Sequence, residues 1–282
     1  MTASTAADTD PSATTAESMV RVTGLKKVYD SKRGPVEAIG DITFEVPRGQ
    51  FACIVGPSGA GKTTLLKCLA GLLAPTAGEV ALEGSRVSGP PRGMAVVFQE
   101  YGRSLFPWKT VQQNVELPLQ LKKVPREERQ RLVGEALSAV GLADRGHAYP
   151  WQLSGGMQQR VAIARAVAYQ PHVLLMDEPF AAVDAQTRAD LEDLVRSLWR
   201  TLGVTTLFVT HDVDEAVYLG ERVLVLSASP TCVLDDITVD LPAEREQVET
   251  RSSARFAELR TRVHRGIQDA KAGRRTPSEH PA

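Results

Sequence analysis

The chain has 282 residues, of which 43% are hydrophobic and 24% charged, a composition typical of a folded globular protein. Its 33 lysine and arginine residues face 34 aspartate and glutamate residues, so no basic excess is present to neutralise a nucleic-acid backbone. No run of about 18 apolar residues occurs, so we expect any membrane role to come through a partner.

The N-terminal segment and the cysteines indicate where the chain works. Residues 1–18 are rich in threonine, alanine and serine and lack the positive start and apolar run of a secretory signal, so we expect a disordered leader. Cys53, Cys68 and Cys232 lie among apolar neighbours without metal-type spacing. This usage is typical of buried thiols in a reduced, cytosolic chain.

The first third of the chain is expected to be mostly strands. Short runs of Val, Ile and Phe, punctuated by Gly and Pro, predict strands between Val20 and about Glu83, including residues 36–46 and 51–55. One helix, from Lys62 to about Leu73, interrupts them.

The middle of the chain is predicted to be mostly helical. Apolar residues at helical spacing follow Arg126, and Gly141 supplies a stop signal. After this region, HVLLMDE, an amphipathic helix and TTLFVTH resemble a parallel strand, a crossover helix and a second strand. The expected buried stripe of that helix is Leu191, Leu194, Val195, Leu198, Trp199 and Leu202.

The strongest motif matches the pattern GxxxxGK[ST], follows an apolar strand and opens a helix. Glycines let the backbone wrap a phosphate chain, and the amides and positive helix end hold the phosphate oxygens. We expect Lys62 to reach the terminal phosphates and the Thr63 hydroxyl to ligate Mg²⁺. The candidate nucleotide-binding residues are Gly56, Pro57, Ser58, Gly59, Ala60, Gly61, Lys62, Thr63 and Thr64.

A second motif, HVLLMDEP, places two acids at the end of an apolar strand. In phosphate-loop ATPases an acid at this point holds Mg²⁺, and a following acid can polarise the attacking water. We therefore assign Asp177 to the metal and Glu178 to the water.

A third segment, LSGGMQQR at residues 153–160, precedes the small and apolar run VAIARAVA. Ser154 is a good helix N-cap, and Gly155 and Gly156 leave the helix start open, which suits an anion. By composition alone, a capped and buried helix is the favoured interpretation.

LSGGMQQR, lying between the phosphate loop and the DE strand, resembles the signature motif of ATP-binding-cassette (ABC) ATPases. With Gln99 after MAVVF and His211 closing TTLFVTH, the order of motifs is similar to that family from about Val20 to Ser227. The resemblance implies that two cassettes pack head to tail. Each ATP would then lie between the phosphate loop of one copy and Ser154, Gly155 and Gly156 of the other.

The resemblance also implies roles for single residues and names ATP and Mg²⁺ as the cofactors. Gln99 would sense Mg²⁺ and the γ-phosphate and link to the membrane partner, and it joins Thr63 and Asp177 as a candidate metal ligand. His211 would contact the γ-phosphate. Tyr29 would stack on adenine, although a surface aromatic on a strand remains the alternative.

The family's fold is α/β. It has a phosphate-loop NTPase core with a mostly parallel sheet and flanking helices, an antiparallel β subdomain and an inserted α-helical subdomain, here at about residues 100–165. We expect the ATPase domain to span residues 19–245, and a C-terminal helix with a frayed tail to occupy residues 246–282. In the loop after Glu178, the resemblance gives Asp184 a role in communication across the dimer.

Residues 99–108 and the run DEPFAAVDAQTR resemble the nitrate, sulfonate and taurine importer branch. This implies transmembrane permease subunits, a second ABC subunit in a homodimer or heterodimer, an extracytoplasmic solute-binding protein reached indirectly, and peripheral attachment at the cytoplasmic face of the membrane. Residues 100–118 would contact the permease through an exposed patch of Leu105, Phe106, Pro107 and Trp108, unless these pack within the helical subdomain.

Two other functions remain open. A soluble ABC-type ATPase acting on nucleic acid or the ribosome is disfavoured by the balanced charge and the importer-like segments. A nucleotide-gated module without hydrolysis is disfavoured because Glu178 and His211 are both present.

Overall fold

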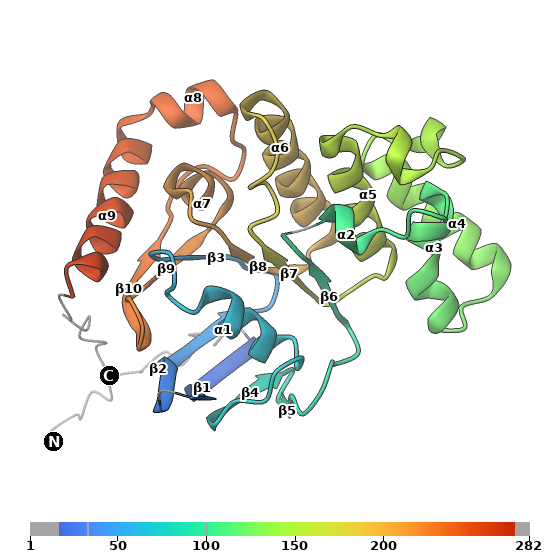
Figure 1. The fold of residues 1–282 in the computed structure, drawn as a ribbon. Coiled ribbons are helices and arrows are strands. Elements are labelled where there is room, and N and C mark those ends of the chain that lie inside the picture. The colour runs from blue at the N-terminus through green and yellow to red at the C-terminus, as the bar shows by residue number, and fades with distance from the viewer. Residues whose placement is uncertain (1–16, 33, 100, 274–282) are drawn as a thin grey trace, which may run out of the picture.

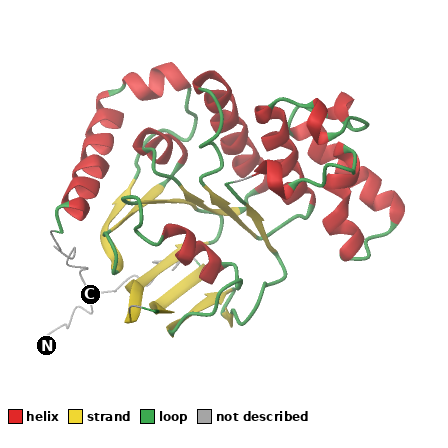
Figure 2. Ribbon diagram, in the orientation of Figure 1, coloured by secondary structure: helices red, strands yellow, loops and turns green. Residues whose placement is uncertain are grey.

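The computed structural model describes residues 17–32, 34–99 and 101–273, without the side chains of residues 101 and 103. Within these residues a ten-stranded sheet has the order β5-β4-β1-β2-β10-β9-β3-β8-β7-β6. In Figure 1, helices α6, α7 and α9 lie above the parallel half of this sheet, α1 lies below it, and α2 to α5 gather at one side. The expected α/β fold, with parallel, antiparallel and helical parts, is confirmed (Figure 2).

The strands divide into a parallel group and an antiparallel group. The parallel group is β3 (Phe51–Val55), β6 (Met94–Val97), β7 (Val173–Asp177), β8 (Thr205–Val209) and β9 (Arg222–Leu226). The antiparallel group is β1 (Ser18–Ser31), β2 (Gly34–Pro47), β4 (Ala77–Leu82) and β5 (Ser85–Arg86). The last strand, β10 (Thr231–Thr238), joins the two groups, because it runs antiparallel to β9 and parallel to β2.

The parallel strands are short and apolar because both of their faces are covered. All five residues of β3 are buried, and successive side chains of a strand point to opposite faces. Phe51, Cys53 and Val55 therefore join the hydrophobic core that contains α6, α7 and α9, whereas Ala52 and Ile54 join the core beneath, with α1. This is the pattern expected of a buried parallel sheet.

The helices follow the predicted order. They are α1 (Lys62–Leu69), α2 (Tyr101–Ser104), α3 (Val111–Leu121), α4 (Arg126–Ala139), α5 (Gly155–Ala168), α6 (Ala185–Leu202), α7 (Val213–Leu219), α8 (Gln247–Ser252) and α9 (Ala254–Lys271). As predicted, α4 begins at Arg126, and Gly141, just beyond its end, has φ +71°. None of the helices in the described residues is long and apolar enough to cross a membrane.

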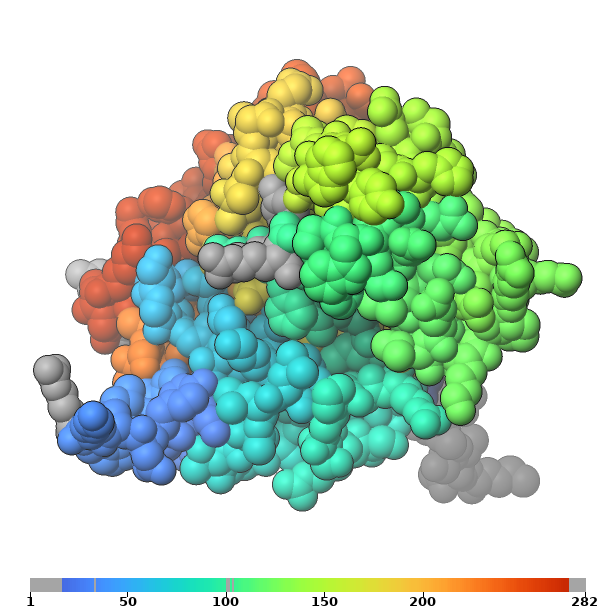
Figure 3. All heavy atoms as spheres, turned by 45° about the vertical axis from the view of Figure 1, so that its right-hand side comes forward, coloured from blue at the N-terminus to red at the C-terminus, as the bar shows by residue number. Residues whose placement is uncertain are grey.

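Helices α2 to α5 form a helical lobe between β6 and β7, seen as the green side of the molecule in Figure 3. The fully buried Asn114 of α3 holds the loop that leads into this helix. Its side-chain amide donates to the carbonyl oxygens of Phe106, Lys109 and Thr110 at 3.0–3.1 Å, and its Oδ1 accepts from the Phe106 N–H at 2.8 Å. The Asn114 side chain thus ties three backbone carbonyls and one N–H of this loop to the start of α3.

The C-terminal region contains two helices where one was expected. Helix α8 ends at Ser252, and Ser253 then caps α9 by accepting from the Phe256 N–H at 3.2 Å. The buried face of α9, at helical spacing, is Phe256, Leu259, Val263, Ile267 and Ala270. Most of these side chains belong to the same core as α6 and α7, so α9 packs as part of the folded domain.

Three expectations about element limits need correction. The expected leader of residues 1–18 lies outside the described residues as far as residue 16, but β1 already begins at Ser18. The helix expected to reach Leu73 ends at Leu69, because the backbone at Gly71 has φ +66°. In α6, Leu202 is half exposed rather than buried, since the last turn extends beyond the core.

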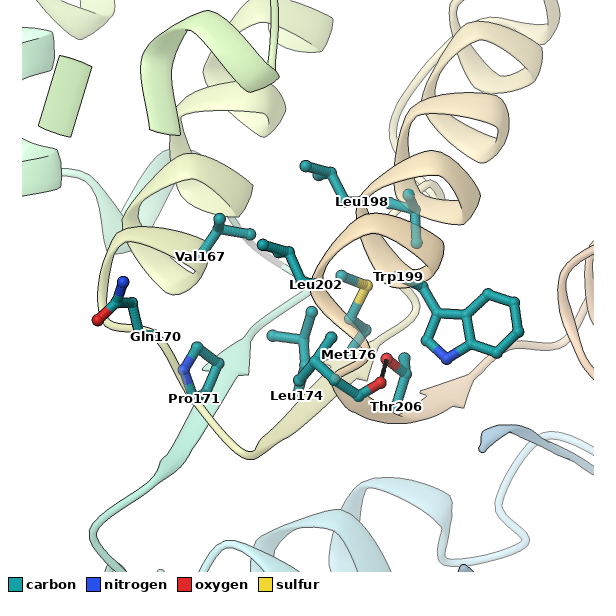
Figure 4. Close-up of a pocket in the computed structure, with 11 residues that line it drawn as sticks. Val167, Gln170, Pro171, Leu174, Met176, Leu198, Trp199, Leu202 and Thr206 are labelled. Carbon is teal, nitrogen blue, oxygen red and sulfur yellow. Dashed lines mark hydrogen bonds between the residues drawn. The ribbon is translucent and has the colours of Figure 1, made fainter. Parts of the chain in front are cut away.

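An apolar cavity of ≈ 200 Å³ lies between the helical lobe and the sheet. Val167, from α5, and Leu198 and Leu202, from α6, face one another across it, above Leu174 and Met176 of β7 (Figure 4). None of the candidate nucleotide-binding, metal-binding or catalytic residues lines this cavity.

The end of α1 yields a test of the fold. The N–H of Leu72 donates to the Lys67 carbonyl at 2.9 Å and that of Gly71 to the Cys68 carbonyl at 3.1 Å, a pattern that requires a left-handed residue after the helix. A Cβ at Gly71 would also lie 2.1 Å from the Gly89 carbonyl oxygen. We therefore expect Gly71→Ala to lower the free energy of unfolding by at least about 2 kcal/mol in urea melts.

The matched control is Gly134→Ala, within the exposed face of α4, where an added Cβ meets nothing within 4 Å. It should raise the free energy of unfolding by up to about 1 kcal/mol. Equal stability of the two variants would contradict the account of the α1 terminus.

Candidate nucleotide-binding site

The motif residues converge because four parallel strands are neighbours. Strands β3, β8, β7 and β6 lie side by side, so their carboxyl ends meet at one edge of the sheet. The phosphate loop follows β3, His211 follows β8, Asp177 ends β7 and Gln99 follows β6. Ligands of open α/β sheets bind at this edge.

The loop between β3 and α1 has the backbone that its glycines predict. Gly59 and Gly61 have φ +78° and +72°, in the left-handed region that glycine adopts without strain. Gly61 is the N-cap of α1, so the loop ends on the N–H groups of the first helical turn. The loop can therefore hold phosphate oxygens by its amides and by the positive end of the helix.

Lys62 lies folded against this loop. Its Nζ donates to the carbonyl oxygens of Gly56 at 2.9 Å and Pro57 at 3.2 Å, and the residue is only 7% exposed. Burial lowers the pKa of Lys62, and the carboxylates of Glu178 and Asp177 counter that effect. The ammonium group is thus held close to both acids of the second motif.

The sequence analysis missed a residue that supports the loop from a distant strand. The Thr231 hydroxyl, on β10, lies 2.5 Å from the Ala60 carbonyl and 2.9 Å from the Ala38 carbonyl. Thr231 is fully buried and lies 171 positions beyond Ala60. No local signal marks it, because a single Thr in a strand has no motif.

Asp177 is 4% exposed, and its Oδ1 has no hydrogen-bond partner among the described residues. The Thr63 side chain hydrogen-bonds to the same carboxyl group. Burial raises the pKa of Asp177, and the Thr63 hydrogen bond and Lys62 oppose that rise. A buried, unpartnered carboxylate oxygen next to a hydroxyl is suited to a hard cation.

The Glu178 carboxylate contacts two other predicted site residues, His211 and Gln99. Its Oε2 lies 3.0 Å from His211 Nδ1 and 3.5 Å from Gln99 Nε2. Its backbone has φ +42°, which is uncommon for a residue with a side chain, and its N–H donates to the Val209 carbonyl at 2.8 Å. Unusual backbone of this kind is concentrated at functional sites.

Tyr29 also reaches the site from the antiparallel strands. Its hydroxyl lies 3.3 Å from Thr64 Oγ1, in the first turn of α1, and 39% of the residue is exposed. The ring is thus near the phosphate loop and open to solvent. Stacking on a base remains a prediction.

The signature segment begins α5, within the helical lobe. Ser154 caps the helix by accepting from the Met157 N–H at 3.4 Å, while Ser154 and Gly155 are exposed. A Cβ at Gly156 would lie 2.3 Å from the Thr187 methyl group of α6. The glycine therefore brings the starts of α5 and α6 together. In Figure 1 this lobe and α1 lie in different parts of the molecule.

The expected docking patch needs a partial correction. Leu105 is 3% exposed and belongs to the core, because it packs under the loop held by Asn114. Pro107 is exposed and Trp108 is 70% exposed, with Phe106 half-buried and its ring 5.4 Å from that of Trp108. Within this stretch, Pro107 and Trp108 are therefore exposed, whereas Leu105 is buried.

Comparison with known proteins identifies the family of this chain. Residues 39–181 match the family model described as ABC transporter. The chain is 46% identical over 233 residues to the nitrate import ATP-binding protein NrtD of Synechocystis, covering 83% of this chain and 87% of that protein. It is 44% identical over 222 residues to the taurine import ATP-binding protein TauB of Yersinia pestis, covering 79% of this chain and 85% of that protein.

Solved structures share the fold of this chain. A dimeric bacterial ABC transporter cassette is 32% identical to this chain, with a TM-score of 0.70 over 79% of this chain and all of the cassette. A post-hydrolysis form of that cassette, bound to ADP and Pi, is 33% identical, with a TM-score of 0.69 over the same shares. Given the matched family model, the relatives above 40% identity and the motifs gathered at one sheet edge, the chain belongs to the ABC transporter family and is one of its ATP-binding, ATP-hydrolysing subunits.

Proposed function

We propose that this chain hydrolyses ATP at a site shared by two copies and thereby drives a membrane importer of a small solute. The observation that carries the proposal is the meeting of Gln99 and His211 on the Glu178 carboxylate, beside the phosphate loop. A water-polarising acid, a switch residue and a phosphate cradle are the parts that ATP hydrolysis requires.

Magnesium fits the donor set of this edge. Asp177 and the Thr63 hydroxyl would hold the ion, with Gln99 as a further oxygen donor, and the unpartnered Asp177 Oδ1 supports that assignment. When bound, the ion would neutralise charge on the phosphate oxygens.

The side chains of the site divide the chemistry among them. Glu178 would accept a hydrogen bond from the attacking water and orient it, and His211, hydrogen-bonded to Glu178, would contact the γ-phosphate. Lys62 would exchange its two carbonyl partners for phosphate oxygens, which are stronger acceptors because they are charged. Tyr29 would stack on the adenine.

The second half of the site would come from the partner copy. Ser154, Gly155 and Gly156 lie exposed or half-exposed at the start of α5, where N–H groups can face a phosphate. The dimeric cassette among the solved relatives supports head-to-tail pairing of two copies. Asp184, which caps α6 close to this segment, would then lie near the interface.

The transported solute is proposed to be nitrate, a sulfonate, taurine or a related small molecule, as the names of the relatives indicate. The chain would bind peripherally to permease subunits at the cytoplasmic face of the membrane, with a solute-binding protein on the other side. Pro107 and Trp108 are the exposed apolar residues best placed in residues 100–118 to contact a permease.

Glu178→Gln tests the assignment of the water-polarising acid. The amide keeps the size of the carboxylate but cannot polarise water, so steady-state ATP hydrolysis should fall at least about a hundredfold while ATP binding is retained. Size-exclusion chromatography in ATP should show a trapped dimer. The matched control is Glu244→Gln, on an exposed side chain that pairs with Arg200 at 3.2 Å, and it should hydrolyse ATP at the wild-type rate.

Hydrolysis by Glu178→Gln at the wild-type rate would contradict the assignment of Glu178 as the acid that polarises the attacking water. If the wild type and both variants bind ATP but none hydrolyses it, even with a permease present, a nucleotide-gated module becomes the better description.

Asp177→Asn tests the assignment of the metal ligand. Removing the buried negative charge should weaken Mg²⁺ binding. The Mg²⁺ concentration needed for half-maximal hydrolysis should therefore rise, and the maximal rate should fall roughly a hundredfold. Hydrolysis measured across a Mg²⁺ titration checks this, with Asp240→Asn, an exposed partner of Arg255, as control. An unchanged Mg²⁺ titration in Asp177→Asn would contradict the metal assignment.

A further inference from the structure

Two loops of the proposed site are joined by one side chain to which the sequence motifs assigned no role. Arg188 lies at the end of the first turn of α6, four residues after Asp184, the N-cap of that helix. Its Nη1 donates to Asp212 Oδ2 at 3.2 Å, and its Nε lies 3.6 Å from Glu215 Oε1. Both acids belong to the turn and helix that follow His211.

The turn around His211 is held by hydrogen bonds on both sides of the histidine. Before it, the Thr210 N–H donates to the Ile54 carbonyl at 3.1 Å, and the Thr210 hydroxyl donates to Glu215 Oε2 at 2.5 Å. After it, Asp212 caps α7 by accepting from the N–H groups of Asp214 and Glu215 at 2.8 and 3.2 Å. The His211 backbone therefore takes its position from Thr210 and Asp212.

Glu215 is buried and needs positive charge nearby. Burial raises the pKa of this carboxyl to about 7, while the Thr210 hydrogen bond and the Arg188 guanidinium counter that rise. A planar guanidinium can face two carboxylates at once, which a lysine ammonium does less well. Arg188 thus stabilises the charged form of a group that itself holds Thr210.

The other end of α7 is anchored independently. The Tyr218 hydroxyl donates to Asp193 Oδ1 at 2.6 Å, and Arg245 Nη1 donates to the Tyr218 carbonyl at 2.6 Å. Loss of Arg188 would therefore loosen the first turn of α7 while the remainder of the helix stays packed. The consequence should be local to the histidine turn.

We infer that Arg188 is a positioning residue that ties the loop carrying Asp184 to the turn carrying His211, so that the placement of His211 follows the start of α6. The loop after Glu178 and the His211 turn belong to different strands, β7 and β8. Arg188 connects the start of α6, which follows the first loop, to Asp212, which follows His211. At the site itself, Glu178 and His211 are hydrogen-bonded to each other. The inference rests on the proposed ATPase function for its kinetic consequence but not for its structural one.

The structural test is independent of hydrolysis. The chain has five histidines, so ¹³C-labelled histidine gives few imidazole signals, and His211→Ala assigns the one from His211. Arg188→Ala should shift or broaden that signal and leave the other histidine signals unchanged. An unshifted His211 signal would overturn the inference, whether or not the protein hydrolyses ATP.

The kinetic test uses a double-mutant comparison. Arg188→Ala should lower kcat roughly ten- to hundredfold, as expected for a displaced reacting group, with KM for ATP changed less than about twofold. Arg188→Lys, which can still pair with Asp212, should recover part of the loss. In a His211→Ala background, Arg188→Ala should have little further effect on single-turnover hydrolysis, because its route to the site is gone.

The control is Arg200→Ala, an exposed arginine of the same helix whose partner is Glu244, and its kcat should equal that of the wild type. Equal losses from Arg188→Ala in the wild-type and His211→Ala backgrounds would overturn the inference, since the effect would then not pass through His211. If Arg188→Ala proves unfolded in thermal melts, the same comparison with Arg188→Lys decides the question. Inactive wild type with a shifted His211 signal would leave the coupling intact and refute the ATPase proposal alone.

Discussion

The site depends on the parallel alignment of β3, β8, β7 and β6, because parallel neighbours place all their carboxyl ends at one edge. Strands β3, β7 and β8 are fully buried, whereas β6 is mostly half-buried, and the residues of the site end or follow these strands. The phosphate loop, the two acids, Gln99 and His211 are far apart in the chain but share this edge. A shift of one strand by a single residue would remove its contribution to the site, since it would turn the side chains to the other face.

Around that edge, polar groups are paired by residues from distant segments. Thr231 supports the phosphate loop from β10, and Arg188 joins the starts of α6 and α7. Such groups cost free energy when buried alone, so each partner both stabilises the fold and restricts the geometry. Asp177 Oδ1 and Arg188 Nε have no hydrogen-bond partner among the described residues, and a metal ion bound at Asp177 would supply the partner that its oxygen lacks.

The helical lobe supplies a second surface for the same chemistry. Its signature helix, α5, begins with an exposed turn that Ser154 caps. The close packing of Gly156 on Thr187 links that turn to α6. Because α6 begins at Asp184 and continues to Arg188, one helix connects the proposed interface with the histidine turn. Closure of two copies and the position of His211 are thereby mechanically related in our proposal.

The sequence by itself predicted the phosphate loop and the paired acids, because these rest on local patterns of glycine spacing and apolar strands, whereas the signature segment and the full α/β architecture were implied by the resemblance to a known family. The predicted α1 was a turn too long, since the left-handed Gly71 carries no unique local signal, and the sequence left open whether Leu105 is exposed or packed within the helical subdomain, where the structure buries it. Only the tertiary structure decided which side chains touch. Thr231, Arg188 and the hydrogen bonds on Glu178 join segments between 24 and 193 positions apart, and contacts across strands and helices are set by packing rather than by spacing along the chain.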